Sequence, residues 1–130
     1  MILLDTHVVF WLALETGKIS KSAAAAIRKQ RANGSNPSIS SISLYEISRA
    51  CERGRTILDV PLETFISRVE SLFDIRPINA PVALTAARLP NSFTGDPADR
   101  IIAATAIVEG LSLITADRNI RRSRLVKTIW

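Results

Sequence analysis

The sequence is poor in the residues that build disulfides and soft-metal centres. Cys51 is its only cysteine, which excludes an internal disulfide and a cysteine-based zinc site and suits a reducing compartment such as the cytoplasm. His7 is its only histidine. Any metal bound by this chain would therefore be held mainly by oxygen ligands, which suit a hard cation such as Mg²⁺ or Mn²⁺ better than zinc.

Aromatic residues and long hydrophobic runs are also scarce. The aromatic content of 5% gives no indication of a stacking platform for single-stranded nucleic acid. The longest apolar runs, near 8–14 and 101–108, are too short to cross a bilayer, and no positively charged leader precedes an apolar segment. We therefore expect a soluble, cytoplasmic protein with no membrane partner. Its 130 residues, 47% of them apolar, suffice for one domain with its own core.

Basic residues outnumber acidic ones, and the excess lies towards the C-terminus. The formal net charge is +5. The segment 110–130 holds one acid, Asp117, and the basic residues Arg118, Arg121, Arg122, Arg124 and Lys127. A basic edge of this kind suits a polyanionic partner. A solvated, partly frayed C-terminus explains it equally well, so the charge alone decides nothing.

Strand-like and helix-like segments alternate along the chain. Short apolar runs predict strands, while helical spacing, an N-cap such as Ser20 and a proline near the first turn predict helices. The predicted strands cover residues 2–4, 38–40, 74–77, 111–115 and 126–129. The predicted helices cover residues 6–14, 20–31, 43–53, 61–73, 80–89 and 97–109, with a short turn or helix at 117–121. This alternation predicts an α/β fold: a central, mostly parallel, twisted sheet of four to five strands with helices on both faces.

An aspartate interrupts the apolar opening stretch MILLDTHVV. Asp5 stands between two core-forming segments, Ile2–Leu4 and Val8–Leu12, where a carboxylate is costly to desolvate. Either Asp5 caps the helix that follows it, or it lies at a site that requires negative charge. The other acids of the chain bear on this choice.

Each of those acids also has a local structural explanation. Glu46 stands three residues after Ser43, which is the spacing of a capping box. Asp99 lies in the first turn of the helix that DPAD begins, and Asp117 follows the strand-like LSLIT. In a parallel α/β sheet, however, every strand-to-helix junction lies at the carboxyl edge, so these acids and Asp5 would meet there. Because caps do not require this convergence, the pattern favours a divalent-cation site at that edge.

A family resemblance is carried by three stretches: LLDTHVVFWLA, SLYEISRA and GDPADRIIAATAIVEGLSLITAD. They are similar to the PIN-domain ribonucleases of the VapC toxin family, in the same order and over nearly the whole chain. The resemblance implies that residues 1–130 form a single PIN domain of PIN-like fold. It also implies a toxin that cleaves RNA endonucleolytically with Mg²⁺ or Mn²⁺, a cognate antitoxin as partner, and a homodimer.

The resemblance assigns a role to each acid. Asp5, Glu46, Asp99 and Asp117 match the four catalytic carboxylates of the family. Asp5, Asp99 and Asp117 would bind the metal ion, directly or through water, and Glu46 would orient the attacking water or hold a second ion. Thr115 falls where the family places a hydroxyl that supports the acids.

Further residues are implied around the acids. Asp96 occupies the D-P-x-D-R position of one branch of the family, where we expect it first to cap the helix and second to contribute to the site. That branch usually has an aromatic residue where this chain has Ala98. Phe10 and Trp11 lie near an expected groove for an apolar antitoxin segment, although Trp11 also suits the core. The arginines expected to contact phosphates, unless they only solvate the surface, are Arg100, Arg118, Arg121 and Arg122.

Three other interpretations stay open at this point. A catalytically inactive PIN-like module would bind RNA or protein without cleaving it. A receiver-like signalling domain also gathers acids at this sheet edge, but here Asp5 has no adjacent acidic partner and the late basic residues are mostly arginine. His7, two residues from Asp5, could serve as a base, although a residue in the first helical turn more often packs or donates a hydrogen bond.

Overall fold

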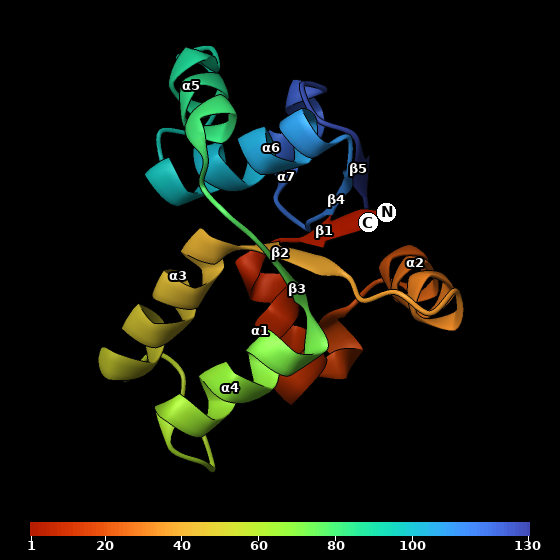
Figure 1. The fold of residues 1–130 in the computed structure, drawn as a ribbon, viewed down its shortest axis with the longest axis vertical. Coiled ribbons are helices and arrows are strands. Elements are labelled where there is room, and N and C mark those ends of the chain that lie inside the picture. Colours follow the sequence, from red (N-terminus) through yellow and green to blue (C-terminus); the bar gives the residue numbers. More distant parts are fainter.

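A five-stranded parallel sheet runs through the middle of the molecule (Figure 1). The computed structural model describes all residues from 1 to 130. The strand order is β3-β2-β1-β4-β5, and all four neighbouring pairs are parallel. The strands are β1 (Ile2–Leu4), β2 (Ser38–Ser40), β3 (Asp74–Arg76), β4 (Ser112–Ile114) and β5 (Thr128–Ile129). The predicted α/β class, parallel sheet and strand number are confirmed.

Helices cover both faces of this sheet, as predicted. In Figure 1, α1 to α4 lie on one side of the strands, and α5 to α7 lie on the other. The helices are α1 (Thr6–Leu14), α2 (Lys21–Ala32), α3 (Ser41–Glu52), α4 (Leu62–Leu72), α5 (Ala80–Arg88), α6 (Pro97–Glu109) and α7 (Arg118–Ser123), with a single 3₁₀ turn η1 (Thr16–Lys18). None of these helices combines the length and the apolarity that a bilayer crossing requires.

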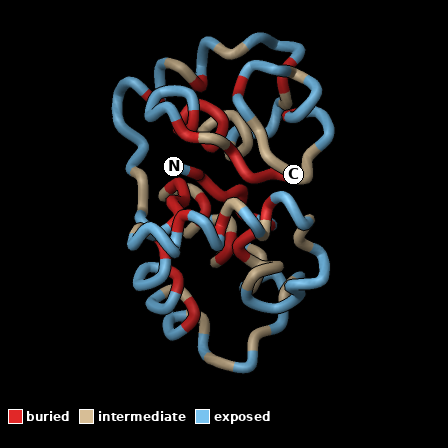
Figure 2. Tube along the Cα trace, turned by 90° about the vertical axis from the view of Figure 1, so that its right-hand side faces the viewer, coloured by how far each residue is buried: buried red, intermediate tan, exposed pale blue.

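The alternation of side chains along β1 divides the core into two parts. Ile2 and Leu4 pack into one cluster with residues of α1 to α4, whereas Leu3 packs into a second cluster with residues of α6 and α7. Since β1 is buried on both faces, its sequence is continuously apolar rather than alternating. Figure 2 shows the buried segments in the interior and the exposed ones along the outer helices and loops.

The start of α3 differs from the prediction. The helix begins at Ser41 rather than Ser43, and the hydroxyl of Ser40 accepts a hydrogen bond from the amide of Ile42. Ser43 is therefore inside the helix and fully buried, so it does not form a capping box with Glu46. The glutamate side chain is thereby left available for contacts with α1.

The end of α6 returns the chain to the sheet. Gly110 has a φ of 65°, the left-handed conformation that a helix C-cap favours and that glycine adopts without a Cβ clash. The chain then enters β4, which pairs with β1 from Ile2↔Ser112 to Leu4↔Ile114. This register aligns the carboxyl end of β4 with that of β1.

Candidate functional site

The acids lie where the chain switches from one side of the central strand β1 to the other. β1 lies between β2 and β4, so the chain extends the sheet on one side through β2 and β3 and on the other through β4 and β5. The crevice at the carboxyl end of such a switch point is where open parallel sheets bind ligands. Asp5 follows β1 directly, and its amide donates to the carbonyl of Ile114 at the end of β4.

A cavity of about 320 Å³ lies at this edge and brings the predicted acids together. Its lining comprises Asp5, Glu46, Asp96, Asp99 and Asp117, together with His7, Trp11 and Ala116. These acids come from the residues after β1 and β4, from the second turn of α3, and from the N-cap and first turn of α6, which are far apart in sequence. The convergence expected from the strand-to-helix junctions is therefore present.

Asp5 caps a helix and faces the cavity at the same time. One carboxylate oxygen, Oδ1, accepts from the amide of Thr6 at 2.8 Å, and the other, Oδ2, accepts from the hydroxyl of Thr115 at 2.8 Å. Only 6% of the residue is exposed. The two explanations considered for Asp5 are thus compatible, because the capping bond fixes the orientation of a carboxylate that lines the site.

Thr115 links two of the acids. Its fully buried hydroxyl donates to Asp5 and accepts from the amide of Asp117 at 3.1 Å. The Asp117 carboxylate in turn caps α7 by accepting from the amide of Ile120 at 2.9 Å. One side chain after β4 therefore positions the carboxylates that follow both central strands.

Glu46 is held by a residue that the sequence analysis did not identify. The hydroxyl of Thr6 donates to Oε1 of Glu46 at 2.5 Å and lies 2.9 Å from the buried hydroxyl of Ser43. These contacts join α1 to α3 at the site. A hydroxyl residue next to Asp5 was the only sequence signal for this role, and hydroxyl residues are too common beside acids to indicate it alone.

Asp99 and Asp96 lie together at the start of α6. Asp96 is exposed and caps the helix, since its Oδ1 accepts from the amide of Ala98 at 2.9 Å, as expected. Asp99 is half-buried, and its Oδ2 accepts from the hydroxyl of Thr94 at 3.4 Å. The Thr94 hydroxyl also accepts from the amide of Asp96 at 3.2 Å, so it contacts both Asp96 and Asp99. Thr94 is a second hydroxyl residue that the sequence analysis did not identify.

The environment of the cavity raises the pKa of three carboxyl groups. Burial, followed by the negative charges of Asp5, Asp96, Asp117 and Glu46, raises the pKa of Asp99 to about 7. Burial is also the main cause that raises the pKa of Asp5 and of Glu46, against the lowering effect of the hydroxyls that donate to them. Ionised carboxylates are therefore destabilised in this cavity by burial and by mutual repulsion, and a bound cation would offset this cost.

His7 does not have the surroundings of a buried general base. The residue is exposed, and its ring lies 6.0 Å from the ring of Trp11, centroid to centroid. Trp11 is half-buried, and the centroid of its ring lies 5.6 Å from that of Trp130. It also lines the cavity, so it belongs both to the core and to the rim of the site. His7 contributes positive charge that lowers the pKa of Asp5 and Glu46.

Arg100 has a structural role in place of the expected phosphate contact. Its guanidinium donates to four backbone carbonyls at 2.6 to 3.3 Å, those of Ala86, Leu89, Pro90 and Thr94. These carbonyls belong to the end of α5 and the loop that leads to α6. Arg100 is therefore a clamp on the loop that carries Thr94, and four of its five N–H donors are used for this role. The structure thus favours a structural role over the expected phosphate contact, and nothing in the sequence indicated this role because the partners are backbone groups, which no sequence motif reveals.

The other three arginines remain near the site. Arg118, Arg121 and Arg122 are exposed on α7, directly after Asp117. Their guanidinium groups form no ion pair or side-chain hydrogen bond within the chain. They are thus available for an external anion.

Comparison with known proteins identifies the family. The PIN domain family matches residues 2–124 of the chain. The chain belongs to the PIN-domain family. A relative from Mycobacterium tuberculosis (strain ATCC 25618 / H37Rv), Ribonuclease VapC22, is 36% identical over 131 residues, which cover 99% of this chain and 98% of the relative. The resemblance to VapC proteins is confirmed.

Solved structures share the fold of this PIN domain. VapBC2 from Rickettsia felis, bound to a DNA fragment from their promoter, matches with a TM-score of 0.73 at 20% identity, covering 98% of this chain and 97% of that chain. A toxin–antitoxin complex from Klebsiella pneumoniae matches with a TM-score of 0.67 at 22% identity, covering 97% and 95%. The PIN-like fold expected from the sequence is therefore confirmed.

The donor chemistry of the PIN-domain cavity fits a hard divalent cation. All its anionic ligands are carboxylates, three of them with raised pKa values, and no cysteine lies among the lining residues. The structure does not place any three His, Cys, Asp or Glu side chains close enough together to hold one ion. The residues thus supply the charge and the ligand type, while the carboxylates stand apart across the cavity.

Replacing Arg100 by methionine should destabilise this PIN domain. The substitution leaves the carbonyls of Ala86, Leu89, Pro90 and Thr94 without their donor, at a cost of about 1–3 kcal/mol in the free energy of unfolding. Urea denaturation measures this quantity. Arg88→Met removes an exposed arginine at the end of α5 and should change it by less than about 0.5 kcal/mol. Equal values for the two variants would contradict the clamp.

The metal-free protein should lose stability as the pH rises towards neutrality. Below pH 3.8 the Asp99 carboxyl is protonated in both states, but between 3.8 and about 7 it ionises in the unfolded chain while the folded chain keeps the proton. The free energy of unfolding should therefore fall across this window, as thermal unfolding in EDTA would measure. Asp99→Asn should flatten the slope, whereas Asp74→Asn, an exposed aspartate of β3, should retain it. An unchanged slope for Asp99→Asn would refute the assignment.

Proposed function

We propose that residues 1–130 act as a single PIN domain that hydrolyses RNA phosphodiester bonds internally, with Mg²⁺ or Mn²⁺, as the toxin of a toxin–antitoxin pair. The observation that carries the proposal is the meeting of five carboxylates in one cavity at the switch point of the sheet. The relationship to Ribonuclease VapC22 over nearly the full chain supports the reaction class. An RNA substrate and the scarcity of cysteine support a cytoplasmic location for the activity.

Each carboxylate has a proposed task that follows from its contacts. Asp5 and Asp99 bind the cation most directly, because Asp5 is the most buried of the acids, and because burial and four neighbouring carboxylates raise the pKa of Asp99 to about 7. Asp117 would bind it directly or through water. Glu46, held by Thr6, orients the attacking water or holds a second ion. When bound, the cation supplies positive charge that activates the water and stabilises the leaving oxygen.

The protein groups around the acids keep this arrangement in place before any cation binds. Thr115 fixes Asp5 relative to Asp117, and Thr94 fixes Asp99 relative to Asp96. Water attacks the phosphorus in line, the bond from phosphorus to the leaving oxygen breaks, and no covalent bond to the protein forms. Arg118, Arg121 and Arg122 are proposed to contact phosphates of the RNA, where arginine forms paired hydrogen bonds.

Asp99→Asn and Asp5→Asn should each abolish RNA cleavage and leave the fold intact, because the amide keeps the size of the side chain and removes its charge. The measurement is cleavage of total cellular RNA by the purified protein with Mg²⁺ or Mn²⁺ and with EDTA. Asp74→Asn, which removes an exposed aspartate away from the cavity, should cleave like the parent.

Two outcomes would contradict the proposal. Cleavage that persists in EDTA or in Asp99→Asn would refute the metal-dependent site. Absence of cleavage in the parent, shown to be folded and free of a copurified inhibitor, would favour the inactive RNA- or protein-binding module instead. A rise in melting temperature on adding Mg²⁺, lost in Asp99→Asn, would report cation binding independently of activity.

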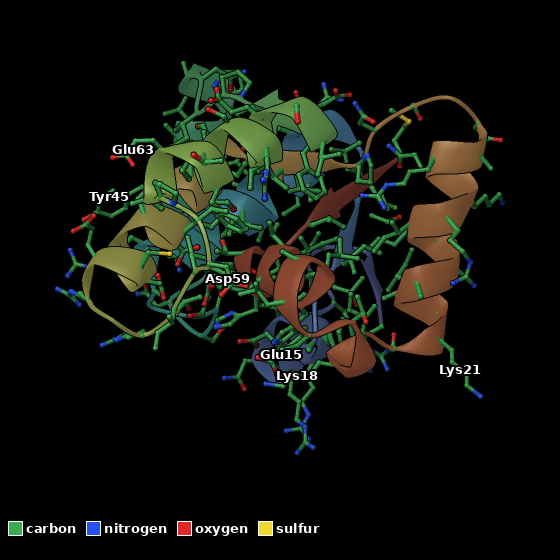
Figure 3. All side chains as sticks on the ribbon, turned by 90° about the horizontal axis from the view of Figure 1, so that it is seen from below. Glu15, Lys18, Lys21, Tyr45, Asp59 and Glu63 are labelled. Atoms are coloured by element: carbon green, nitrogen blue, oxygen red, sulfur yellow. The ribbon has the colours of Figure 1, made fainter.

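The proposed antitoxin has an apolar groove available beside α1. A hollow of about 430 Å³ lies between α1, α4 and the loop before α4, and ten of its 13 lining residues are hydrophobic. Leu72, at the end of α4, is 53% exposed in its wall. Figure 3 views this side of the molecule, with Asp59 of the loop beside α1. Phe10, expected near such a groove, does not line the hollow itself but stacks on Phe65, which does, with the ring centroids 6.3 Å apart.

Leu72→Glu should weaken antitoxin binding at least tenfold, since it places a charge in the wall of the groove at a cost of about 1.4 kcal/mol or more. Leu84→Glu is the matched control, because Leu84 is 51% exposed on α5 and lines none of the described cavities. Titration calorimetry with the cognate antitoxin measures both. Equal affinities would show that the antitoxin lies elsewhere. Light scattering of the free protein would test the homodimer that the family resemblance implies.

A further inference from the structure

A second hollow, separate from the acidic cavity, is lined almost entirely by arginine. It has a volume of about 540 Å³ and no hydrophobic lining residue. Its wall comprises Arg118, Arg121, Arg122 and Arg124 of the α7 segment and Thr128 of β5. None of these residues lines the cavity of the acids.

The positive charge of this hollow has no counterpart within the chain. The ion pairs of the protein join Lys18 to Glu15 and Arg76 to Glu109, and both lie in other elements. No guanidinium of the hollow donates a hydrogen bond to the protein, whereas that of Arg100 donates four. Four like charges around one space repel each other, and an anion between them would remove this cost.

One of the four arginines occupies a backbone position where glycine is favoured. Arg124 has a φ of 56° and is the one non-glycine residue of the chain with a positive φ. Such a conformation costs a branched or long side chain about 1 kcal/mol relative to glycine. Glycine would avoid this cost but would supply no guanidinium group to the hollow. The presence of arginine at this position therefore supports a binding role for its side chain.

The hollow adjoins the site of reaction. Asp117 lines the acidic cavity, and the next residue, Arg118, lines the hollow. A strand of RNA whose scissile phosphate lies among the carboxylates can therefore continue over α7 towards β5. Arginine matches the phosphate group with paired donors, and the Thr128 hydroxyl adds a further donor.

We propose that the hollow is a second phosphate subsite, which binds a backbone phosphate of the same RNA at least one nucleotide away from the scissile bond. This inference rests on the proposed ribonuclease function. It adds the path of the substrate strand, from the acidic cavity over α7 towards β5. It also adds Arg124, which the sequence analysis did not single out for this role. Recognition at such a subsite is independent of base sequence, so it sets the affinity and register of the RNA rather than its identity.

The test measures RNA binding rather than cleavage. In an Asp99→Asn background, the affinity for a fluorescent single-stranded RNA of about twelve nucleotides is measured as a function of salt. Arg121→Gln/Arg124→Gln should weaken binding roughly five- to tenfold and lower the slope of log K against log salt by about 1.4, the value for two lost phosphate contacts on a single strand. Arg121→Lys/Arg124→Lys should keep the slope and recover only part of the affinity.

The matched control removes the same charge elsewhere. Arg28→Gln/Arg31→Gln alters two exposed arginines of α2 that line neither the hollow nor the acidic cavity. If both double variants lose affinity equally, the effect is general attraction to a basic protein and the subsite is refuted. A parent that cleaves no RNA, with the two double variants still separated, would overturn the proposed function and leave the phosphate site standing.

Discussion

The central position of β1 is the constraint on which the site depends. Because β1 pairs in parallel with both β2 and β4, the chain leaves three neighbouring strands at the same edge of the sheet. Asp5 and Asp117 follow two of these strands, and Glu46 lies on the helix that follows the third. Packing supports this arrangement, since Leu3 and Leu4 are fully buried on opposite faces. The core of the protein thus fixes the positions of the acids.

Carboxylates this close together repel one another, and this repulsion would destabilise the edge of the sheet if they had no hydrogen-bond donors from the protein. The structure stabilises them with local donors: backbone amides at the helix starts and the hydroxyls of Thr6, Thr94 and Thr115. These donors lower the pKa values of Asp5 and Glu46, but burial outweighs them and the pKa values stay raised. The remaining electrostatic cost is the one that the proposed cation would offset.

Much of this could be predicted from the sequence, because strand ends and helix starts leave local signals. The apolar run before Asp5 and the DPAD start before Asp99 mark junctions, and parallel topology sends junctions to one edge. Features that depend on tertiary contacts could not be predicted in this way. Ser43 and Glu46 match a capping box by spacing, but Ser43 is buried inside α3 and faces Thr6 instead. The backbone carbonyls that hold Arg100 carry no side-chain signature at all.

The contrast between Arg100 and the arginines of α7 gives the basic charge two distinct functions. Arg100 lies beside Asp99 in sequence, but its guanidinium turns away to the α5–α6 loop and neutralises none of the acids through an ion pair. Arg118 likewise follows Asp117 without pairing to it. An ion pair between Arg100 and Asp99, or between Arg118 and Asp117, would weaken the attraction of the acid for a cation. In the second pair, Arg118 would also be less available to a phosphate. Because the two signs of charge are adjacent but unpaired, the acids stay free for the proposed cation and the arginines of α7 stay free for the proposed RNA backbone.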